Sequence, residues 1–339
     1  MAAQRDKLVS ALGTVVSNVD NLDAVVPVLQ QLGRDHRRFG AVAEHYPAVG
    51  ASLLATLRYF LGPQWTEELA NEWAAAYGLV AKVMVQAAEE AEADSPAWWI
   101  ADVLAVERRT MDVAVVQLRP QEQFDYVPGQ SFAMEIPRRP RLWRYYSPAN
   151  APREDGTIEL HVQLVAGGQV STSMVRSLRA GDTVKMGAPV GDQLVHTADD
   201  SRGILMVAAG TGLAPLRAIL EQIDRNWQVN GQAPPVQLFH GVRMPWNLYE
   251  HQRLTALAQR PWFDYTPVVS DDSSYPGTRG LVGSVAAQSA RRDGSRAMVC
   301  GSGEMVQHAV GELTKAGTTR EDIRFDEFAK AGSGTGDME

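Results

Sequence analysis

The sequence predicts a chain of three domains: an all-α domain, an antiparallel β-barrel, and a parallel α/β sheet. Three changes of pattern along the chain predict this order. Apolar residues recur at helical spacing over residues 2–92, short alternating segments separated by turn residues run from 99 to about 197, and strand–turn–helix units repeat from 201 onward. We therefore expect domains at 1–95, 96–199 and 200–330, with a disordered Gly/Ser-rich tail at 331–339.

The composition is typical of a soluble, cytoplasmic protein. The 339-residue chain has a net charge of −8, which argues against nucleic acid or an anionic membrane as its main partner. Its one cysteine, Cys300, cannot build a disulfide framework, a cysteine-ligated zinc site or a four-cysteine iron–sulfur cluster within the chain. No apolar run approaches the roughly 20 residues of a membrane span, and no signal peptide is recognised.

The helical domain is predicted from periodicity and from capping residues. Leu53 and Leu57 recur at the spacing of one helix face. Thr66 precedes the acidic pair at 67–68 and is the expected N-cap of a later helix. The segment Asp94-Ser95-Pro96 is the expected linker to the barrel.

The barrel carries two motifs that favour a flavin site. An isoalloxazine ring needs an aromatic wall, a cation for the diphosphate and a small hydrogen-bonding side chain, and Arg144, Tyr146 and Ser147 supply these types after the turn Pro128-Gly129-Gln130. A surface strand with an aromatic pair is the alternative interpretation. About 20 residues later, Gly167-Gly168 leads into an expected Ser/Thr-capped helix, whose backbone N–H groups suit a pyrophosphate.

The α/β domain carries two glycine turns at strand ends. Gly210-Thr-Gly-Leu-Ala-Pro215 closes an apolar strand and opens a helix, so its glycines permit a tight turn and close approach of a dinucleotide. Cys300-Gly301 likewise ends a strand, at the carboxyl edge where open sheets bind ligands. Ordinary strand-to-helix turns, and a small buried apolar role for Cys300, are the alternatives.

With these motifs in this order, residues 99–328 resemble a ferredoxin-NADP reductase-type module, with an FAD-binding barrel followed by a pyridine-nucleotide domain. The resemblance implies three groups of site residues. FAD is expected to contact Gln130, Arg144, Tyr146 and Ser147 (the last near flavin N5), and Gly168, Gln169, Val170 and Ser171 around the diphosphate. NAD(P)H is expected at Gly210, Thr211, Gly212 and Pro215, with Cys300 and Gly301 beside the nicotinamide, and Phe328 is expected to pack by the flavin.

The helical region resembles the second half of a flavohemoglobin globin domain. His36 lies ten residues before Tyr46-Pro47, and Trp73-Ala-Ala-Ala-Tyr77-Gly follows. The resemblance implies that His36 is the proximal ligand of heme b and that Tyr46 supports it. It also places Gln4 and Leu8 where distal-pocket residues lie. Considered alone, His36 is typical of a solvated histidine at a helix end.

The globin resemblance is N-terminally truncated. The chain begins at the distal helix, and we expect Met1 to be an internal methionine of a longer protein. The family's proximal glutamate falls at Ala88, and the adjacent Glu89 and Glu90 point elsewhere on a helix. The resemblance therefore implies heme b as a cofactor of the helical region, in addition to FAD and NAD(P)H in the other two domains.

The resemblance implies an FAD-dependent NAD(P)H oxidoreductase of flavohemoglobin type, which passes electrons from NAD(P)H through FAD to heme and converts nitric oxide to nitrate with O2. Tyr46, Ser147 and Cys300 are the expected catalytic residues. The alternatives are a heme-free NAD(P)H:acceptor flavin reductase with a separate protein acceptor, and a gas- or redox-binding sensor. The sequence does not decide between NADH and NADPH as the hydride donor. Arg243 could bind the 2′-phosphate of NADPH, whereas Asp271 and Asp272 could disfavour it.

Overall fold

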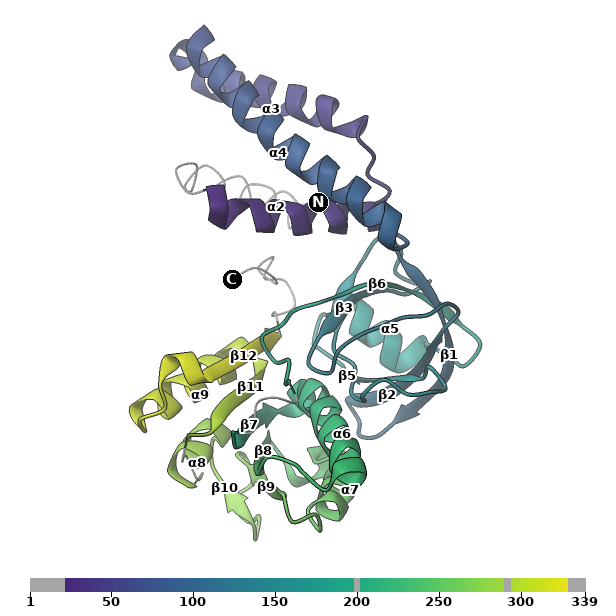
Figure 1. Cartoon of the computed structure of the whole chain (residues 1–339), viewed down its shortest axis with the longest axis vertical. Coiled ribbons are helices and arrows are strands. Elements are labelled where there is room, and N and C mark those ends of the chain that lie inside the picture. Colours follow the sequence, from purple (N-terminus) through teal and green to yellow (C-terminus); the bar gives the residue numbers. More distant parts are fainter. Residues whose placement is uncertain (1–21, 198–201, 290–293, 329–339) are drawn as a thin grey trace. The chain divides into compact units, whose positions relative to one another are not determined.

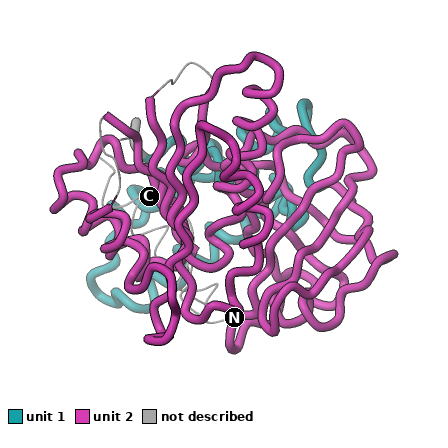
Figure 2. The backbone as a smooth tube through the Cα atoms, turned by 90° about the horizontal axis from the view of Figure 1, so that it is seen from below, with its two compact units in different colours: residues 1–98, 338–339 teal, residues 99–337 magenta. Residues whose placement is uncertain are grey.

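The computed structural model describes residues 22–197, 202–289 and 294–328. Gln4, Leu8 and the tail at 331–339 lie outside these ranges. The chain divides into two compact units, residues 1–98 with 338–339, and residues 99–337 (Figure 2). Each unit is described by itself.

The first unit is helical. Its helices are α2 (Leu22–His36), α3 (His45–Leu61) and α4 (Glu67–Asp94), and Thr66 caps α4 as predicted, its hydroxyl accepting from Leu69 N at 3.2 Å. Helices α2 and α4 pack through a core of Val25, Leu29 and Met84. A Cβ at Gly33 would lie 2.2 Å from the Met84 carbonyl oxygen, so the glycine permits this close packing.

The second unit begins with an antiparallel six-stranded sheet in the order β4-β3-β6-β1-β2-β5 (Figure 1). An antiparallel bridge between Pro148 and Leu160 brings the strand after β4 against β5, so the two ends of the sheet meet. Helix α5 packs Val170 and Met174 into the core between them. The elements of this domain are β1 (Trp99–Arg108), β2 (Val113–Pro120), β3 (Ser131–Glu135), β4 (Arg144–Tyr146), β5 (Ile158–Gln163), α5 (Gln169–Ser177) and β6 (Thr183–Val190).

A parallel six-stranded sheet follows, in the order β10-β9-β8-β7-β11-β12. One face packs against α6 and α7, the other against α8 and α9 (Figure 1). The chain runs outward from β7 to β10 and then returns to β11 on the other side of β7. The strand order therefore reverses between β7 and β11, and such sheets bind ligands at the carboxyl ends of the strands at this switch point. The elements are β7 (Ile204–Ala209), α6 (Leu213–Asn230), β8 (Val236–Val242), α7 (His251–Leu257), β9 (Phe263–Val269), β10 (Thr278–Arg279), α8 (Val282–Ser289), β11 (Arg296–Ser302), α9 (Gly303–Lys315) and β12 (Ile323–Phe328).

The predicted fold class is confirmed: helices come first, then an antiparallel sheet, then a parallel sheet with helices on both faces. Among the helices of the described ranges, none has both the length and the apolar character needed to cross a bilayer.

Candidate functional site

The predicted nucleotide turn lies at the switch point of the parallel sheet. Strand β7 ends at Ala209, a 3-10 turn spans Gly210–Gly212, and α6 begins at Leu213. Gly210 has φ 53°, a left-handed conformation that favours glycine. A Cβ at Gly212 would lie 2.2 Å from the Cys300 carbonyl oxygen, so the turn packs directly against the end of β11. The two predicted glycine turns of the α/β domain are therefore adjacent.

The rest of this turn is buried. Thr211 is 7% exposed, and Pro215 is buried in the first turn of α6, where its missing N–H leaves no hydrogen bond unmade. The N-terminus of this 18-residue helix therefore presents unpaired N–H groups and a positive dipole end at the predicted dinucleotide site.

Cys300 is fully buried on β11 and packs among apolar side chains below the turn, with Phe328 of β12 against the same cluster. Burial, and then the charge of Asp326, raise the pKa of the Cys300 thiol well above its ordinary value. Burial therefore favours the protonated thiol over the thiolate. Gly301 follows at the strand end, where an added Cβ would lie 2.4 Å from Met305 Cε.

The flavin motif on β4 ends in a buried hydroxyl. Arg144 is exposed, and burial raises the pKa of the half-buried Tyr146. Ser147 is 5% exposed, and its Oγ has no hydrogen-bond partner among the described residues. Buried hydroxyls are almost always paired, so this group matches a missing ligand atom. The residues present therefore fit a flavin ring at this strand.

The second flavin motif lies where it can complete the same site. The Ala149 amide donates to the Glu159 carbonyl oxygen at 2.7 Å, which places the strand after β4 beside β5, the strand that leads to Gly167 and α5. Gly167 has φ 76°, as a tight glycine turn requires. Gln169, the first residue of α5, is exposed.

One detail of this motif was predicted wrongly: Gly168, not a serine or threonine, is the N-cap of α5, and it makes no side-chain cap bond. Ser171 lies inside the helix and its Oγ accepts from Val165 N at 3.2 Å. Val170 points into the barrel core, so only its backbone is available to a diphosphate. Gln130 is half-buried, and its amide oxygen accepts from Val127 N at 2.9 Å, which closes the preceding turn.

The barrel and the parallel sheet meet through contacts that join the flavin and nucleotide motifs. Arg217 of α6 donates to the Ala149 carbonyl oxygen, two residues after Ser147. A Cβ at Gly210 would lie 3.1 Å from Oε1 of Gln163 on β5. The structure thus brings the flavin strand, the nucleotide turn and the Cys300 strand end to one edge of the second unit.

A buried polar network at this junction was not predicted from the sequence. Glu159 on β5 is 3% exposed and pairs with Arg217 Nη1 of α6 at 3.1 Å and with Arg253 Nη1 of α7 at 3.4 Å. Burial would raise the pKa of Glu159, but a hydrogen bond with His161 and the charges of the two arginines outweigh it and lower the pKa to about 2. The available signal was the alternation Ile158-Glu-Leu-His161, which puts two titratable side chains on one face of a strand.

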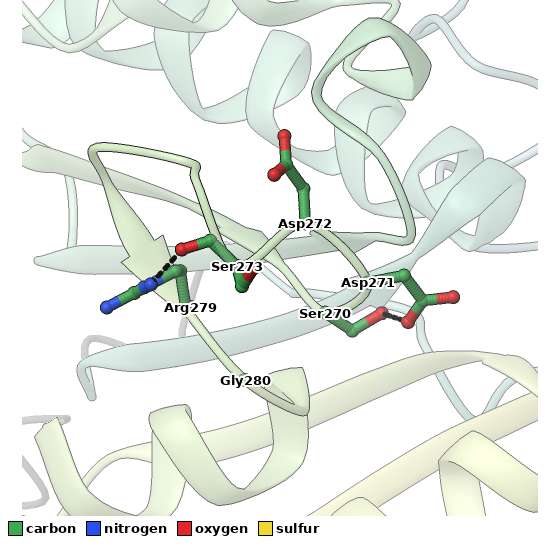
Figure 3. Close-up of a pocket in the computed structure, with 6 residues that line it drawn as sticks. All are labelled: Ser270, Asp271, Asp272, Ser273, Arg279 and Gly280. Carbon is green, nitrogen blue, oxygen red and sulfur yellow. Dashed lines mark hydrogen bonds between the residues drawn. The ribbon is translucent and has the colours of Figure 1, made fainter.

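A hollow of about 490 Å³ lies beyond β9, at the same carboxyl edge as the nucleotide turn (Figure 3). Asp271 lies 3.6 Å from the exposed Arg243 Nε, and Ser274 hydrogen bonds lower the pKa of Asp272. Arg279 Nη1 donates a hydrogen bond to the Ser273 carbonyl oxygen. The lining residues are Ser270, Asp271, Asp272, Ser273, Arg279 and Gly280.

In the helical unit, His36 ends α2 and its Nδ1 donates to the Leu32 carbonyl oxygen at 2.7 Å. Such a bond orients the ring and leaves Nε2 as the metal-binding nitrogen, so the histidine fits a heme ligand. Tyr46 packs by Leu32 against the Leu29–Met84 core, and its carbonyl oxygen accepts from Tyr77 OH at 2.7 Å. Beside it lies an apolar hollow of about 400 Å³, lined by Ala43, Tyr46, Pro47, Tyr77, Gly78, Ala81, Lys82 and Val85.

Comparisons with known proteins match all three parts of the chain. Residues 1–84 match the globin family model, residues 102–194 the oxidoreductase FAD-binding domain, and residues 206–311 the oxidoreductase NAD-binding domain. The chain therefore contains an FAD-binding and an NAD-binding oxidoreductase domain after a globin-type region.

Two curated relatives are flavohemoproteins. The flavohemoprotein of Bordetella parapertussis is 29% identical over 236 residues, 65% of this chain and 58% of that protein. The flavohemoprotein of Bacillus subtilis is 29% identical over 231 residues, 64% of this chain and 57% of that protein. The matched part is thus less than two thirds of either relative.

Solved structures agree on the fold. An Amycolatopsis cytochrome P450 reductase is 29% identical with a TM-score of 0.62, over 68% of this chain and 69% of that one. A flavohemoglobin from Malassezia yamatoensis with bound FAD and heme is 15% identical with a TM-score of 0.71, over 89% of this chain and 79% of that one. The second likeness bears on the fold alone.

Proposed function

Because the chain belongs to the flavohemoglobin family, we propose that it is an FAD-dependent NAD(P)H oxidoreductase that passes electrons through FAD to heme and converts nitric oxide to nitrate with O2. The observation that carries the proposal is a buried, unpartnered Ser147 hydroxyl on a strand segment that Arg217 of α6 links, through the Ala149 carbonyl oxygen, to the helix that follows the glycine turn. When bound, FAD accepts a hydride and delivers electrons, and heme supplies the site for O2.

The residues of the second unit divide the work of binding and orientation. Arg144 and the N-terminus of α5 would hold the FAD diphosphate, Tyr146 would cover the ring, and the Ser147 hydroxyl would hydrogen-bond to the ring. The backbone of Gly210–Gly212 and the N-terminus of α6 hold the nucleotide diphosphate.

At the nicotinamide edge, Gly301 lets the ring approach the end of β11. Cys300 acts there by packing, because its thiol is buried and protonated. Phe328 packs against the same apolar cluster and would shield the flavin from water.

The helical unit holds the electron acceptor in this proposal. His36 would hold heme iron through Nε2 while Nδ1 stays bonded to the Leu32 carbonyl oxygen, and Tyr46 packs against the core of α2 and α4. Ala88 lies where the family has a glutamate, and Glu89 and Glu90 are exposed. The His36 imidazole is therefore oriented by the Leu32 carbonyl oxygen and by packing. The protein acts in the cytoplasm on small molecules.

The hydride donor in this proposal is NADH. A carboxylate at this sheet edge hydrogen-bonds a ribose 2′-hydroxyl, whereas a 2′-phosphate needs a basic partner. The hollow beyond β9 presents Asp271 and Asp272, while Arg279 is held by a carbonyl oxygen. In this proposal one of these two carboxylates accepts a hydrogen bond from the ribose 2′-hydroxyl, which a 2′-phosphate could not donate.

Substitution of His36 tests whether the helical unit binds heme while the second unit alone carries out electron transfer from NADH. His36→Ala is expected to abolish a Soret band while NADH-to-dye electron transfer stays within about twofold, because the variant removes one heme ligand and no flavin or nucleotide contact. Equal loss of dye reduction in a folded variant would contradict the proposal. Flavin bands without a Soret band in the unaltered protein would instead identify the heme-free reductase with a separate acceptor.

A further inference from the structure

Three aromatic side chains form a stack between the flavin barrel and the nucleotide turn. The His161 ring on β5 meets the Tyr249 ring edge-on at 5.1 Å between centroids and 88°. Tyr249, which follows β8, meets His240 of β8 at 6.0 Å and 85°. His161 and His240 are buried and Tyr249 is partly buried, so most of their polar atoms find partners inside the protein, with His240 Nδ1 the exception among the described residues.

The two hydrogen bonds from Tyr249 through His161 to Glu159 run in one direction. Glu159 is ionised and can only accept, so His161 Nε2–H donates to Glu159 Oε1, 3.2 Å away. Burial lowers the pKa of His161, which leaves its ring neutral and its Nδ1 an acceptor. The Tyr249 hydroxyl, whose pKa burial raises, therefore donates to His161 Nδ1 at 2.9 Å.

The other end of the stack reaches the nucleotide turn itself. His240 Nε2 lies 3.1 Å from the Gly210 carbonyl oxygen, which can only accept, so this nitrogen carries the proton. Burial lowers the pKa of His240 to about 4, so the ring is neutral. The left-handed Gly210 is thus held by a buried histidine that packs on Tyr249.

The barrel end of the stack is fixed equally well. Arg217 and Arg253 hold the Glu159 carboxylate, and Arg217 Nε also lies 3.1 Å from Glu250 Oε2. The backbone of Glu159 accepts from Ala149, two residues beyond Ser147. A continuous set of contacts therefore connects the strand that carries Ser147 with the turn that begins at Gly210.

We propose that Glu159, His161, Tyr249 and His240 form a positioning relay that fixes the nucleotide turn relative to the flavin strand, so that the rate of hydride transfer depends on the Tyr249 hydroxyl. This rests on the proposed function, in which the donor binds at Gly210 and the flavin at Ser147. Hydride transfer is sensitive to such positioning, since misplacement by about 1 Å costs on the order of 100-fold in rate. The relay residues touch neither ligand in this account and act through the elements they hold.

Anaerobic stopped-flow reduction of the bound FAD by NADH tests the relay. Tyr249→Phe removes one oxygen and keeps the ring, and we expect the limiting reduction rate to fall about tenfold while the apparent NADH Kd and the FAD content stay within twofold. The matched control is Tyr265→Phe, which removes another hydroxyl near a histidine, 3.4 Å from His251 Nδ1, outside the relay. Its rate should stay within twofold of the unaltered protein. NADH deuterated at C4 verifies that the observed phase is hydride transfer.

A double-mutant cycle separates the relay from general structural loss. His161→Leu removes both hydrogen bonds, so its rate should fall as far as that of Tyr249→Phe, and the double variant should fall no further. His161→Gln keeps a donor and an acceptor, so its rate should stay within threefold of the unaltered protein. This last variant also tests the relay if Tyr249→Phe fails to fold.

Two outcomes would overturn the relay alone: an unchanged limiting rate in Tyr249→Phe, or additive losses in the double variant. A change in NADH Kd with an unchanged limiting rate would also overturn it, because it would indicate a role in binding. Failure of NADH to reduce FAD in the unaltered protein would overturn the proposed function as well. The two failures are therefore distinguishable.

Discussion

Ser147 presents a buried hydroxyl that no described part of the chain satisfies. Its replacement therefore affects the protein differently with and without FAD. Ser147→Ala should leave the free energy of unfolding of the cofactor-free protein unchanged or raise it by about 1 kcal/mol, because no protein hydrogen bond is lost. FAD affinity should fall about fivefold, the worth of one hydrogen bond. Thermal melts and fluorescence titration with FAD measure the two effects, and a large loss of stability without FAD would show that the hydroxyl has a structural partner.

Arg144 is an exposed cation on the same strand, so its main effect should be on ligand binding. Arg144→Ala should weaken FAD binding by about 1.5–3 kcal/mol, because a charge-assisted phosphate contact is lost. Arg138→Ala, at another exposed position of the same domain, is the control. Retention of FAD on dilution equal to that of the control would remove Arg144 from the diphosphate site.

At the scale of elements, the glycine turn and the strand beside it are one packed unit. Gly212→Ala would place a Cβ 2.2 Å from the Cys300 carbonyl oxygen, and we expect a loss of about 1–3 kcal/mol in unfolding free energy together with weaker NADH binding. Gly311→Ala in α9 has nothing within 4 Å of the added Cβ and should instead stabilise by about 0.5–1 kcal/mol. Urea unfolding compares the two, and equal effects would contradict the close packing of the turn.

The local patterns were readable from the sequence, and the long-range contacts were not. Alternation, glycine turns and the Thr66 cap depend on neighbouring residues, so they predicted the fold class and the patches around Ser147, Gly210 and Cys300. The Ser/Thr cap of α5 was predicted wrongly, because Gly168 already supplies the non-helical backbone that an N-cap needs. The role of each predicted site residue remains a prediction.

The polar junction was missed for a different reason. His161 and Tyr249 are 88 residues apart, and neither forms a motif with its sequence neighbours. Buried polar pairs such as Arg217 with Glu159 become visible only after two domains pack together. Sequence patterns identify the ligand-binding turns, whereas their mutual alignment depends on tertiary contacts.

For the whole molecule, the lowered pKa of Glu159 predicts how the junction responds to acid. A carboxyl with a depressed pKa contributes stability above its unfolded value, here 4.5, and loses it as the pH falls toward its folded value of about 2. Glu159→Gln should destabilise the protein by about 3 kcal/mol at pH 7, because Arg217, whose side chain is 14% exposed, loses its buried carboxylate partner. The difference between the variant and the unaltered protein in urea unfolding should shrink from pH 4.5 downward. A difference independent of pH over that window would contradict the ionised junction.

The acidic hollow beyond β9 predicts the donor. The limiting rate divided by Kd should favour NADH over NADPH by about tenfold or more, and Asp271→Ser should narrow that ratio by removing a charge near the 2′-position. A preference for NADPH in the unaltered protein would reverse the assignment of the hollow.

The most direct test of the whole account is the visible spectrum of the purified full-length chain, before and after anaerobic addition of NADH. The account predicts flavin bands that bleach on addition of NADH, and a Soret band that shifts as electrons arrive from the flavin. Absence of flavin bands, flavin bands that NADH leaves unchanged, or absence of a Soret band would contradict it.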